Sequence, residues 1–335
     1  MKMNFKGRDF LRILDFSEEE LRFMLDAAKR FKEMKHAGEN HKYFPGKNIA
    51  VLFEKTSTRT RCAFEVAGYD LGMNVTYLDP TGSQMGHKES VADTARVLAR
   101  FYDGIEFRGF KQETVDDLAK YADVPVWNGL TDYCHPTQAL ADFMTIEEKL
   151  GGFSGKTLAF VGDTRNNVAN SLMAMAAKMG MNFIACGPNE LHPSEDIVNA
   201  CRPIAEKNGA TITITDDINA LNDTADAIYT DIWLSMGEDK EKWGERIDQL
   251  QSYRVTMEMI NKAKPGCIFL HCLPSFHDLN TSVARDVHEK FGIEEMEVAN
   301  EVFESEHSAV FDEAENRLHT IKAVMYLTLT DEYNQ

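Results

Sequence analysis

The stretch that decides the fold is the apolar run Asn48-Ile-Ala-Val-Leu-Phe53, followed by Ser57-Thr-Arg-Thr-Arg61. The run predicts a buried strand, and the hydroxyl residues after it predict the start of a helix over residues 61–68. The first N–H groups of a helix lack partners and its dipole favours negative charge, so this junction predicts an anion site. Guanidinium and hydroxyl donors there suit phosphate oxygens. The alternative is an ordinary helix cap followed by a solvated basic turn.

The residues that follow repeat this strand-to-helix pattern. Further strand-like runs occupy residues 75–78, 105–107 and 124–127, with an amphipathic segment over residues 89–101. A longer helical pattern at residues 139–150 is closed by two glycines and predicts a linker helix. Strands that alternate with helices predict a parallel sheet with helices on both faces.

The second half of the chain shows the same alternation more clearly. Its candidate buried strands are residues 157–161, 182–186, 210–214, 227–229 and 267–270. The sequence therefore predicts an α/β fold of two doubly wound parallel-sheet domains joined by interdomain helices, the second domain being Rossmann-like. The turn after the first of these strands lacks the G-x-G-x-x-G pattern, which disfavours a dinucleotide and a dinucleotide-dependent oxidoreductase.

Length and composition limit the possibilities further. At 335 residues the chain is long enough for two domains, each of about 150 residues. We place them at residues 1–150 and 151–316, and we expect a C-terminal helix at about residues 317–333 to pack back on the first.

The charge and the cysteines exclude several classes of partner. The net charge of −18 disfavours nucleic acid and anionic membranes, because both need a basic surface. No apolar run approaches the roughly 18 residues of a membrane span, and the N-terminus lacks a signal-peptide core, so we expect a cytoplasmic location. Six scattered cysteines without a C-x-x-C pair predict free thiols and argue against a zinc knuckle.

Polar residues follow the predicted strands, where open parallel sheets bind ligands. Arg108 follows the third strand, and His135 stands at the head of the linker helix. In the second half, Asn167, Asp231 and Cys272 occupy such positions and suit a cationic amine with a polar head group. The alternatives are a surface ion pair for Arg108, a structural histidine, a helix cap for Asp231 and a small core residue for Cys272.

Five motifs stand in a fixed order along the chain. They are Ser57-Thr-Arg-Thr-Arg61, Phe107-Arg-Gly109, His135-Pro-Thr-Gln138, Asp231-x-x-x-Ser-Met-Gly237 and His271-Cys-Leu-Pro274. Together with the segments 82–90, 162–167 and 301–305, they resemble the motifs of the aspartate/ornithine carbamoyltransferase family over essentially the whole chain.

The resemblance implies a role for each matching residue. The residues implied for carbamoyl phosphate are Ser57, Thr58, Arg59, Thr60, Gln84, Arg108, His135, Gln138, Cys272, Leu273 and Arg317. Those implied for ornithine are Asn167, Asp231, Ser235 and Met236, and those implied for catalysis are Arg108, His135, Asp231 and Cys272. The match of Gln84 implies that it reaches a neighbouring subunit's site, and hence a homotrimer with shared sites, with further assembly of trimers left open.

The resemblance also implies a reaction. The δ-amine of L-ornithine attacks the carbamoyl group of carbamoyl phosphate and gives L-citrulline and phosphate, with no metal and no cofactor. This reaction belongs to arginine metabolism and can serve arginine biosynthesis or run backwards to harvest carbamoyl phosphate.

The acceptor can be argued from charge. An aspartate acceptor needs basic partners, whereas the segment Ser235–Asp239, a candidate mobile lid, and Asp231 upstream of it are acidic. A cationic acceptor therefore fits better, and Asn167 favours ornithine over putrescine because it suits an α-carboxylate. A protein of this fold that binds ligand without turnover is the alternative from another class, yet all the residues expected for catalysis are present.

Overall fold

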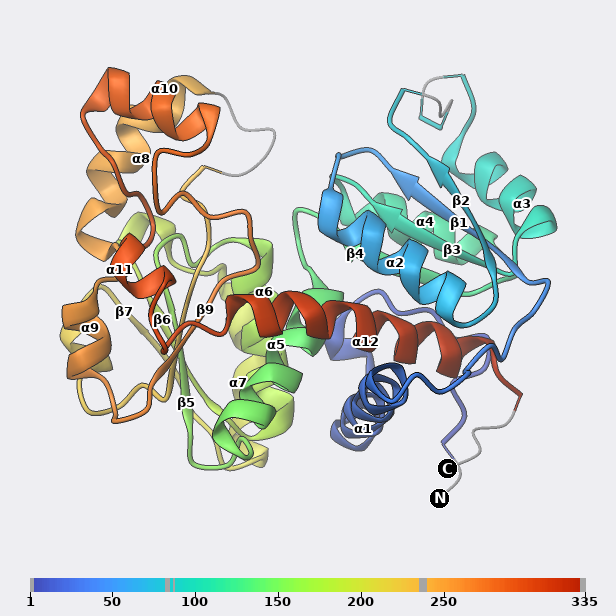
Figure 1. Ribbon diagram of the computed structural model, residues 1–335, viewed down its shortest axis with the longest axis horizontal. Helices are drawn as coiled ribbons and strands as arrows, with labels where there is room; N and C mark the ends of the chain where they lie inside the picture. The colour runs from blue at the N-terminus through green and yellow to red at the C-terminus, as the bar shows by residue number, and fades with distance from the viewer. Residues whose placement is uncertain (1–2, 82–84, 87, 235–239, 332–335) are drawn as a thin grey trace. The chain divides into compact units, whose positions relative to one another are not determined.

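The computed structural model describes residues 3–81, 85–86, 88–234 and 240–331. The chain divides into two compact units, each with its own parallel sheet (Figure 1). Unit 1 comprises Met1–Met144 and Glu315–Gln335, and unit 2 comprises Thr145–Ala314. Two parallel-sheet α/β units confirm the predicted fold class.

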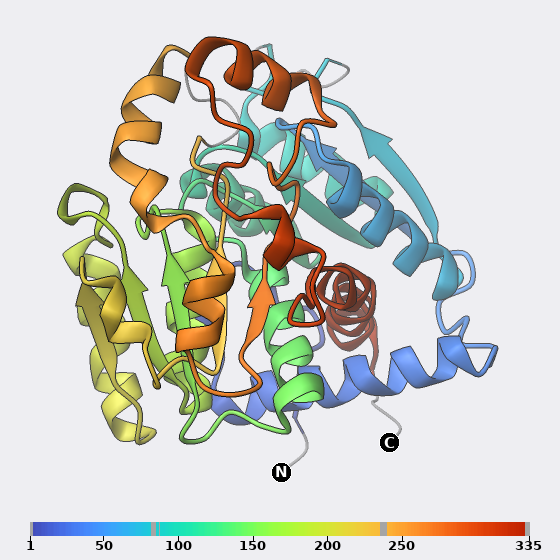
Figure 2. The same cartoon turned by 60° about the vertical axis from the view of Figure 1, so that its left-hand side comes forward.

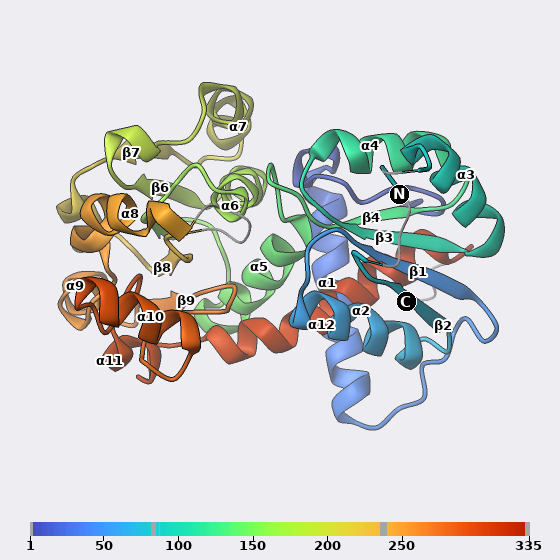
Figure 3. The same ribbon diagram turned by 90° about the horizontal axis from the view of Figure 1, so that it is seen from above.

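Unit 1 contains a four-stranded parallel sheet in the order β2-β1-β3-β4. The strands are β1 (Asn48–Phe53), β2 (Asn74–Leu78), β3 (Gly104–Arg108) and β4 (Val126–Leu130). The helices are α1 (Glu18–His36), α2 (Thr58–Asp70), α3 (Val91–Phe101) and α4 (Gln112–Tyr121), with a 3-10 turn at Ile13–Asp15. Figure 3 shows α3 and α4 on one face of this sheet and α1 and α2 on the other.

Alternate residues of β1 face the two helical layers, as a doubly wound sheet requires. Leu52 is fully buried in the same apolar cluster as residues of α3 and α4. On the other face, α2 approaches closely at Gly68, where an added Cβ would lie 2.6 Å from Val75 and 3.5 Å from Ile49. The apolar run at residues 48–53 is therefore continuous because both of its faces are covered.

The fourth strand lies later than the predicted run at residues 124–127. It spans Val126–Leu130 and includes the polar Asn128 and Gly129, which an apolar-run criterion misses. An added Cβ on Gly129 would lie 1.9 Å from Glu106 Oε1, so the close approach of β3 explains this glycine.

Unit 2 contains a five-stranded parallel sheet in the order β7-β6-β5-β8-β9. The strands are β5 (Thr157–Val161), β6 (Asn182–Cys186), β7 (Ile212–Thr215), β8 (Ala227–Thr230) and β9 (Ile268–Leu270). The helices are α6 (Asn167–Met179), α7 (Glu195–Lys207), α8 (Trp243–Leu250), α9 (Met257–Lys262), α10 (Ser282–Phe291) and α11 (Asn300–Phe303). Short 3-10 turns occur at Asn189–Leu191, Ile218–Leu221, Lys240–Lys242 and Gln251–Tyr253.

The chain order reverses at β5, which lies between β6 and β8 (Figure 2). This is the strand order of a Rossmann-like sheet, in which ligands bind outside the carboxyl ends of the strands at the switch point. Helices α9 and α11 cover one face through a core that includes Ile228, Met259, Phe269 and Val302.

The chain passes from one unit to the other within two helices. Helix α5 (Pro136–Leu150) begins directly after His135, as predicted for the head of the linker helix, because Pro136 suits the first helical position. Helix α12 spans Val310–Leu329, and its residues from Glu315 onward belong to unit 1. Within the described ranges, no helix has the length and apolar character needed to cross a bilayer.

Candidate active site

The junction between β1 and α2 forms the predicted helix start. Ser57 is the N-cap residue, and its hydroxyl accepts a hydrogen bond from the Thr60 backbone N–H at 3.3 Å. The first turn of α2, all of which the structure describes, carries no acidic residue. Arg61 points to another partner, because its Nε donates to Glu65 at 3.0 Å and its guanidinium lies 3.8 Å from the Tyr77 ring centroid. Of the two arginines in this segment, Arg61 is thus engaged elsewhere.

Two buried guanidinium groups converge on one hydroxyl beside this junction. Arg108, at the end of β3, donates from Nη1 to Thr60 Oγ1 at 3.3 Å. Arg317 of α12 donates from Nη2 to the same oxygen at 3.1 Å and from Nη1 to Gln138 Oε1. Gln138 in turn donates to Asp142 at 2.7 Å. Two buried cations held close together are stabilised by an anion, so this cluster is suited to phosphate.

Glu106 lies beside these arginines and faces the same interior. It is fully buried, and neither carboxylate oxygen has a hydrogen-bond partner among the described residues. Burial raises the pKa of Glu106 well above its usual value, and Arg108 and Arg317 offset part of that rise. This residue was missed by the sequence reasoning, although a glutamate inside the apolar run of β3 is itself an unusual signal.

His135 immediately precedes α5 and is 4% exposed. Its Nδ1 lies 3.4 Å from the Thr137 hydroxyl. Burial lowers the pKa of His135 well below its usual value, and the positive charges of Arg317, Arg108 and Arg59 lower it further. The imidazole is therefore neutral at physiological pH and offers one N–H donor and one acceptor.

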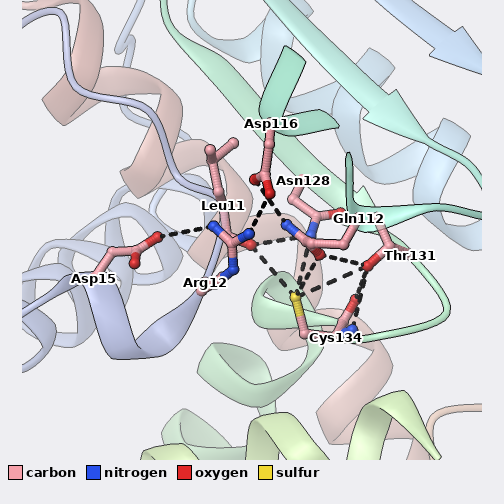
Figure 4. A network of polar contacts seen from close by, with 8 residues as sticks. All are labelled: Leu11, Arg12, Asp15, Gln112, Asp116, Asn128, Thr131 and Cys134. Atoms are coloured by element: carbon pink, nitrogen blue, oxygen red, sulfur yellow. Dashed lines mark hydrogen bonds and ion pairs between the residues drawn. The ribbon is translucent and has the colours of Figure 1, made fainter. Parts of the chain in front are cut away.

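A polar network fixes the residue before His135 (Figure 4). Cys134 exchanges bonds with Thr131, whose backbone N–H donates to the Cys134 carbonyl at 2.9 Å and whose hydroxyl accepts from the Cys134 N–H at 3.2 Å. The Cys134 thiol donates to the carbonyl of Leu11 at 3.4 Å and to Gln112 Oε1 at 3.3 Å. Burial raises the pKa of this thiol to about 12, so it stays protonated and serves as a donor.

The N-terminal segment reinforces the same network. Asn128 donates to the Leu11 carbonyl at 2.9 Å, and Arg12 forms an ion pair with Asp116 of α4. Gln112 donates to the same aspartate at 3.2 Å (Figure 4). Residues far apart in sequence therefore hold the start of α5, and no local pattern indicated them.

In unit 2, Asp231 follows β8 at the carboxyl edge of the sheet. Its Oδ1 accepts from the Cys272 thiol at 3.2 Å and from the Ile232 N–H at 2.8 Å, and its Oδ2 accepts from Asn166 at 3.1 Å. Burial raises the pKa of Asp231, and its hydrogen bonds and the nearby His271 limit the rise. The carboxylate and the thiol predicted from the sequence therefore lie in direct contact.

Asn167 is the first residue of α6, and Asn166 is the N-cap of that helix. The Asn166 side chain accepts from the Ala169 N–H at 2.8 Å while its amide donates to Asp231. Asn167 thus stands in the first turn of a helix, where a carboxylate is favourable.

The loop after β9 is held by a buried histidine and two buried glutamates. His271 is fully buried, with Nε2 3.2 Å from Glu297 Oε1 and its backbone N–H 2.9 Å from Glu313 Oε2. Its Nδ1 accepts from the Leu273 N–H at 2.9 Å. Leu273 has φ of +57°, a conformation that costs a branched residue energy and needs such support.

Burial and the neighbouring charges shift the pKa values of His271 and Glu297 in opposite directions. Burial lowers the pKa of His271, but Glu297, Asp231 and Glu313 outweigh that effect and the pKa is raised. Burial alone would raise the pKa of Glu297. Its hydrogen bonds from His271 and from the Phe276 N–H have the larger effect, so its pKa lies below the usual value. Because Nδ1 accepts from Leu273, the ring proton lies on Nε2, which donates to the Glu297 carboxylate.

The predicted residues fall into two groups in the structure. In unit 1, Thr60, Arg108, Gln138 and Arg317 are joined by hydrogen bonds, and the charges of Arg317, Arg108 and Arg59 act on His135. In unit 2, Asp231 and Cys272 are joined, with Leu273 next to them. Gln84, Ser235 and Met236 lie outside the described residues.

Both halves of the chain match domains of known proteins. Residues 8–148 match the carbamoyl-phosphate-binding domain of aspartate/ornithine carbamoyltransferases, and residues 154–328 match their aspartate/ornithine-binding domain. The chain belongs to the aspartate/ornithine carbamoyltransferase family. The buried guanidinium cluster thus lies largely within the part matched by this family's carbamoyl-phosphate domain, with Arg317 supplied from α12.

Individual members of the family are similar over nearly their whole length. The chain is 60% identical over 326 residues to a catabolic ornithine carbamoyltransferase of Treponema denticola, covering 97% of this chain and 96% of that protein. It is 58% identical over 328 residues to catabolic ornithine carbamoyltransferase 1 of Staphylococcus epidermidis, covering 97% and 99%. The solved ornithine carbamoyltransferase of Pyrococcus furiosus has a TM-score of 0.89 at 40% identity, covering 99% and 100%.

Proposed function

We propose that this chain is an ornithine carbamoyltransferase, which transfers the carbamoyl group of carbamoyl phosphate to the δ-amine of L-ornithine. The products are L-citrulline and phosphate. The convergence of Arg108 and Arg317 on the Thr60 hydroxyl, beside the start of α2, is the observation that supports this most strongly. The names of the relatives from Treponema and Staphylococcus support the same acceptor.

The phosphate of carbamoyl phosphate binds at the start of α2. Backbone N–H groups of the first turn and the side chains of Ser57, Thr58 and Arg59 surround it, because the helix dipole and the hydroxyl and guanidinium donors all favour an anion there. Arg108 contributes a second guanidinium from the end of β3. Bidentate contacts of this kind fix both the position and the orientation of a phosphate.

The carbamoyl oxygen gains negative charge when the amine attacks. Donors fixed before the reaction stabilise that charge without reorganising, and this differential stabilisation lowers the barrier. His135 is suited to the role because its neutral imidazole donates a hydrogen bond without giving up a proton. Thr60, Arg108 and Gln138 complete the set of donors, with Arg317 orienting Thr60 and Gln138.

Unit 2 provides the acceptor site. Asn167, at the first turn of α6, binds the α-carboxylate, and Asp231 binds the α-amino group. Ser235 and Met236 are further contacts that we carry over from the sequence. An acidic group and an amide suit ornithine, whereas an aspartate acceptor needs a basic side chain for its second carboxylate.

The attacking amine must be neutral, although it is mostly protonated near pH 7. Cys272 and Asp231, whose side chains are 3.2 Å apart, form the pair that favours the free amine. The raised pKa of Asp231 makes it a better proton acceptor than an exposed aspartate. Attack of the neutral amine on the carbamoyl carbon forms a C–N bond, the C–O bond to phosphate breaks, and the proton lost by nitrogen leaves to this pair or to phosphate.

The relatives in Treponema and Staphylococcus are named catabolic enzymes, which favours arginine catabolism over arginine biosynthesis as the role of this chain. In that role the enzyme cleaves citrulline with phosphate and yields carbamoyl phosphate. The proposal is tested by trapping carbamoyl phosphate as it forms from citrulline and phosphate.

We also propose a homotrimer with shared sites that works in the cytoplasm. Exposed apolar side chains on α2 and α3 support association, including Tyr69 at 53% and Phe101 at 68% exposure. Sedimentation velocity of the full chain tests the trimer, and cell fractionation tests the location. A monomer that is fully active would contradict the shared site.

The acceptor is tested by offering ornithine, putrescine and aspartate in parallel with carbamoyl phosphate, and measuring ureido product and phosphate release in each. Turnover with ornithine alone is expected. Turnover mainly with putrescine would show that Asn167 does not select an α-carboxylate. No turnover with any acceptor would favour a protein that binds these ligands without reaction.

A further inference from the structure

A cluster of two histidines and a glutamate joins α1 to α12 within unit 1, and none of its three residues belongs to the site described above. Figures 1 and 2 show the two helices crossing. His36 is the last residue of α1, and Glu315 and His319 are four residues apart on α12. An i, i+4 spacing places two side chains on the same face of a helix. The crossing of the two helices brings the third side chain to that face.

The donor atoms of these residues are close together. His36 Nε2 lies 2.7 Å from Glu315 Oε1, and His319 Nε2 lies 3.5 Å from the same oxygen. One donor atom from each of the three residues lies within 4.8 Å of the others. In a tetrahedral zinc site with bonds of about 2.1 Å, donor atoms are roughly 3.4 Å apart. Small side-chain rotations therefore suffice to place all three around one ion.

His319 provides an independent reason to look for a ligand. Its side chain is 1% exposed, yet neither ring nitrogen has a hydrogen-bond partner among the residues that the structure describes. A buried polar group without a partner costs free energy, and most such groups in proteins are satisfied. The Nε2 atom faces the Glu315 carboxylate, so a cation between them would satisfy it.

We propose that His36, Glu315 and His319 bind a divalent transition-metal ion such as Zn²⁺, Co²⁺ or Ni²⁺. Imidazole and carboxylate ligands are typical of these ions, and three protein ligands leave a position for water. Burial lowers the pKa of His319 to about 4, which leaves its ring neutral and able to donate a lone pair. The ion would connect the end of α1 to α12 at Glu315 and His319, which flank Arg317 in the sequence.

Lys32 limits the affinity of this site. Its ammonium donates to Asn316 Oδ1 at 2.9 Å, next to Glu315, and its charge acts on both Glu315 and His319. A positive charge that acts on two of the three ligands also repels a cation bound between them. Replacement of Lys32 by glutamine should therefore tighten metal binding, whereas loss of a ligand should weaken it.

The experiment is a titration of the metal-free full chain with Co²⁺, followed by absorption spectroscopy. A second group in the described part of the chain, Asp231, His271 and Cys272, also has close donor atoms. A site there includes a thiolate and gives a sulfur-to-cobalt charge-transfer band in the near ultraviolet. The proposed site has only nitrogen and oxygen ligands and gives visible d–d bands without it. His36→Gln is the test variant, because His36 is exposed and its loss leaves the core intact.

His288→Gln, in unit 2, is the matched control. The d–d bands should appear in the wild type and in H288Q, and H36Q should bind Co²⁺ about 100-fold more weakly, since even loss of an outer-shell partner costs 10- to 100-fold. Lys32→Gln should bind more tightly than the wild type. Equal binding by H36Q and H288Q, or a spectrum with only the thiolate band, would overturn the proposal. Neither readout depends on turnover, so the outcome is separate from that of the proposed function.

Discussion

Replacement of Thr60 by valine tests how the guanidinium cluster is held. Valine has nearly the same shape as threonine but lacks the hydroxyl that accepts from Arg108 at 3.3 Å and from Arg317 at 3.1 Å. Thr60 is 1% exposed, so water does not readily replace the lost acceptor. Both guanidiniums then lose one hydrogen bond, and their orientation toward the phosphate becomes less defined.

The magnitude follows from the two bonds. A hydrogen bond to a charged group contributes about 1.5–3 kcal/mol, and both contacts are long, so we take the lower value for each and expect T60V to lose about 3 kcal/mol of unfolding free energy. The loss of an oriented donor near the carbamoyl oxygen should lower kcat/KM for carbamoyl phosphate by about 100-fold. Urea unfolding measures the first effect, and initial rates at saturating ornithine measure the second.

Thr328→Val is the matched control. Thr328, on α12, is also buried. Its hydroxyl accepts a hydrogen bond from Trp127 Nε1 at 2.9 Å. Removing that acceptor should cost about 1–3 kcal/mol of unfolding free energy and leave kcat/KM unchanged. Equal losses of kcat/KM in T60V and T328V would show that the effect reflects general destabilisation and that the Thr60 hydroxyl does not orient the two guanidinium groups.

Three further changes give distinct outcomes. Asp231→Asn should raise KM for ornithine by about 10- to 100-fold, because a charged hydrogen bond is lost, and change KM for carbamoyl phosphate little; equal effects on both substrates would contradict its assigned role. Glu297→Gln should lower the unfolding free energy at pH 7 by about 1.5–3 kcal/mol, since the hydrogen bond from His271 loses its charged acceptor; unchanged urea unfolding would show that the charge of Glu297 does not stabilise this loop. Asp9→Asn should stabilise the protein above pH 6. Burial raises the pKa of Asp9 from 3.8 to about 6, so the wild type loses stability as the pH rises between these two values, and the asparagine variant does not. The gain should reach about 1–2 kcal/mol, because solvent screens part of the shift, and vanish below about pH 4, with the amide oxygen still accepting from the Val126 N–H; a gain that persists at low pH would exclude titration of Asp9 as its cause.

The sequence was informative where the physics is local. Continuous apolar runs such as Thr157–Val161 and Asn182–Cys186 coincide with β5 and β6, because strands buried on both faces carry no alternation. Ser17 and Glu20 have the three-residue spacing that is typical of a capping box, and the structure contains both of its hydrogen bonds at the start of α1. A strand followed by hydroxyl residues likewise located the start of α2.

The sequence was uninformative where contacts join distant segments. Glu297 and His271 meet only through the folding of unit 2, and no periodicity links them. The network around Cys134 joins the N-terminal segment at Leu11 to α4, which local patterns do not record. The polar and glycine residues of β4 masked the second half of an edge strand, since close packing against Glu106 replaces the usual apolar pattern. Long-range packing thus decided what local propensity did not.

The most direct test of the central claim follows the carbamoyl carbon. The full chain is incubated with ¹³C-labelled carbamoyl phosphate and L-ornithine, and the label is followed by NMR while phosphate is measured in the same sample. We expect the label to enter the ureido group of citrulline, with one phosphate released for each citrulline formed. Release of phosphate without labelled citrulline, or no loss of carbamoyl phosphate beyond its spontaneous decay, would contradict it.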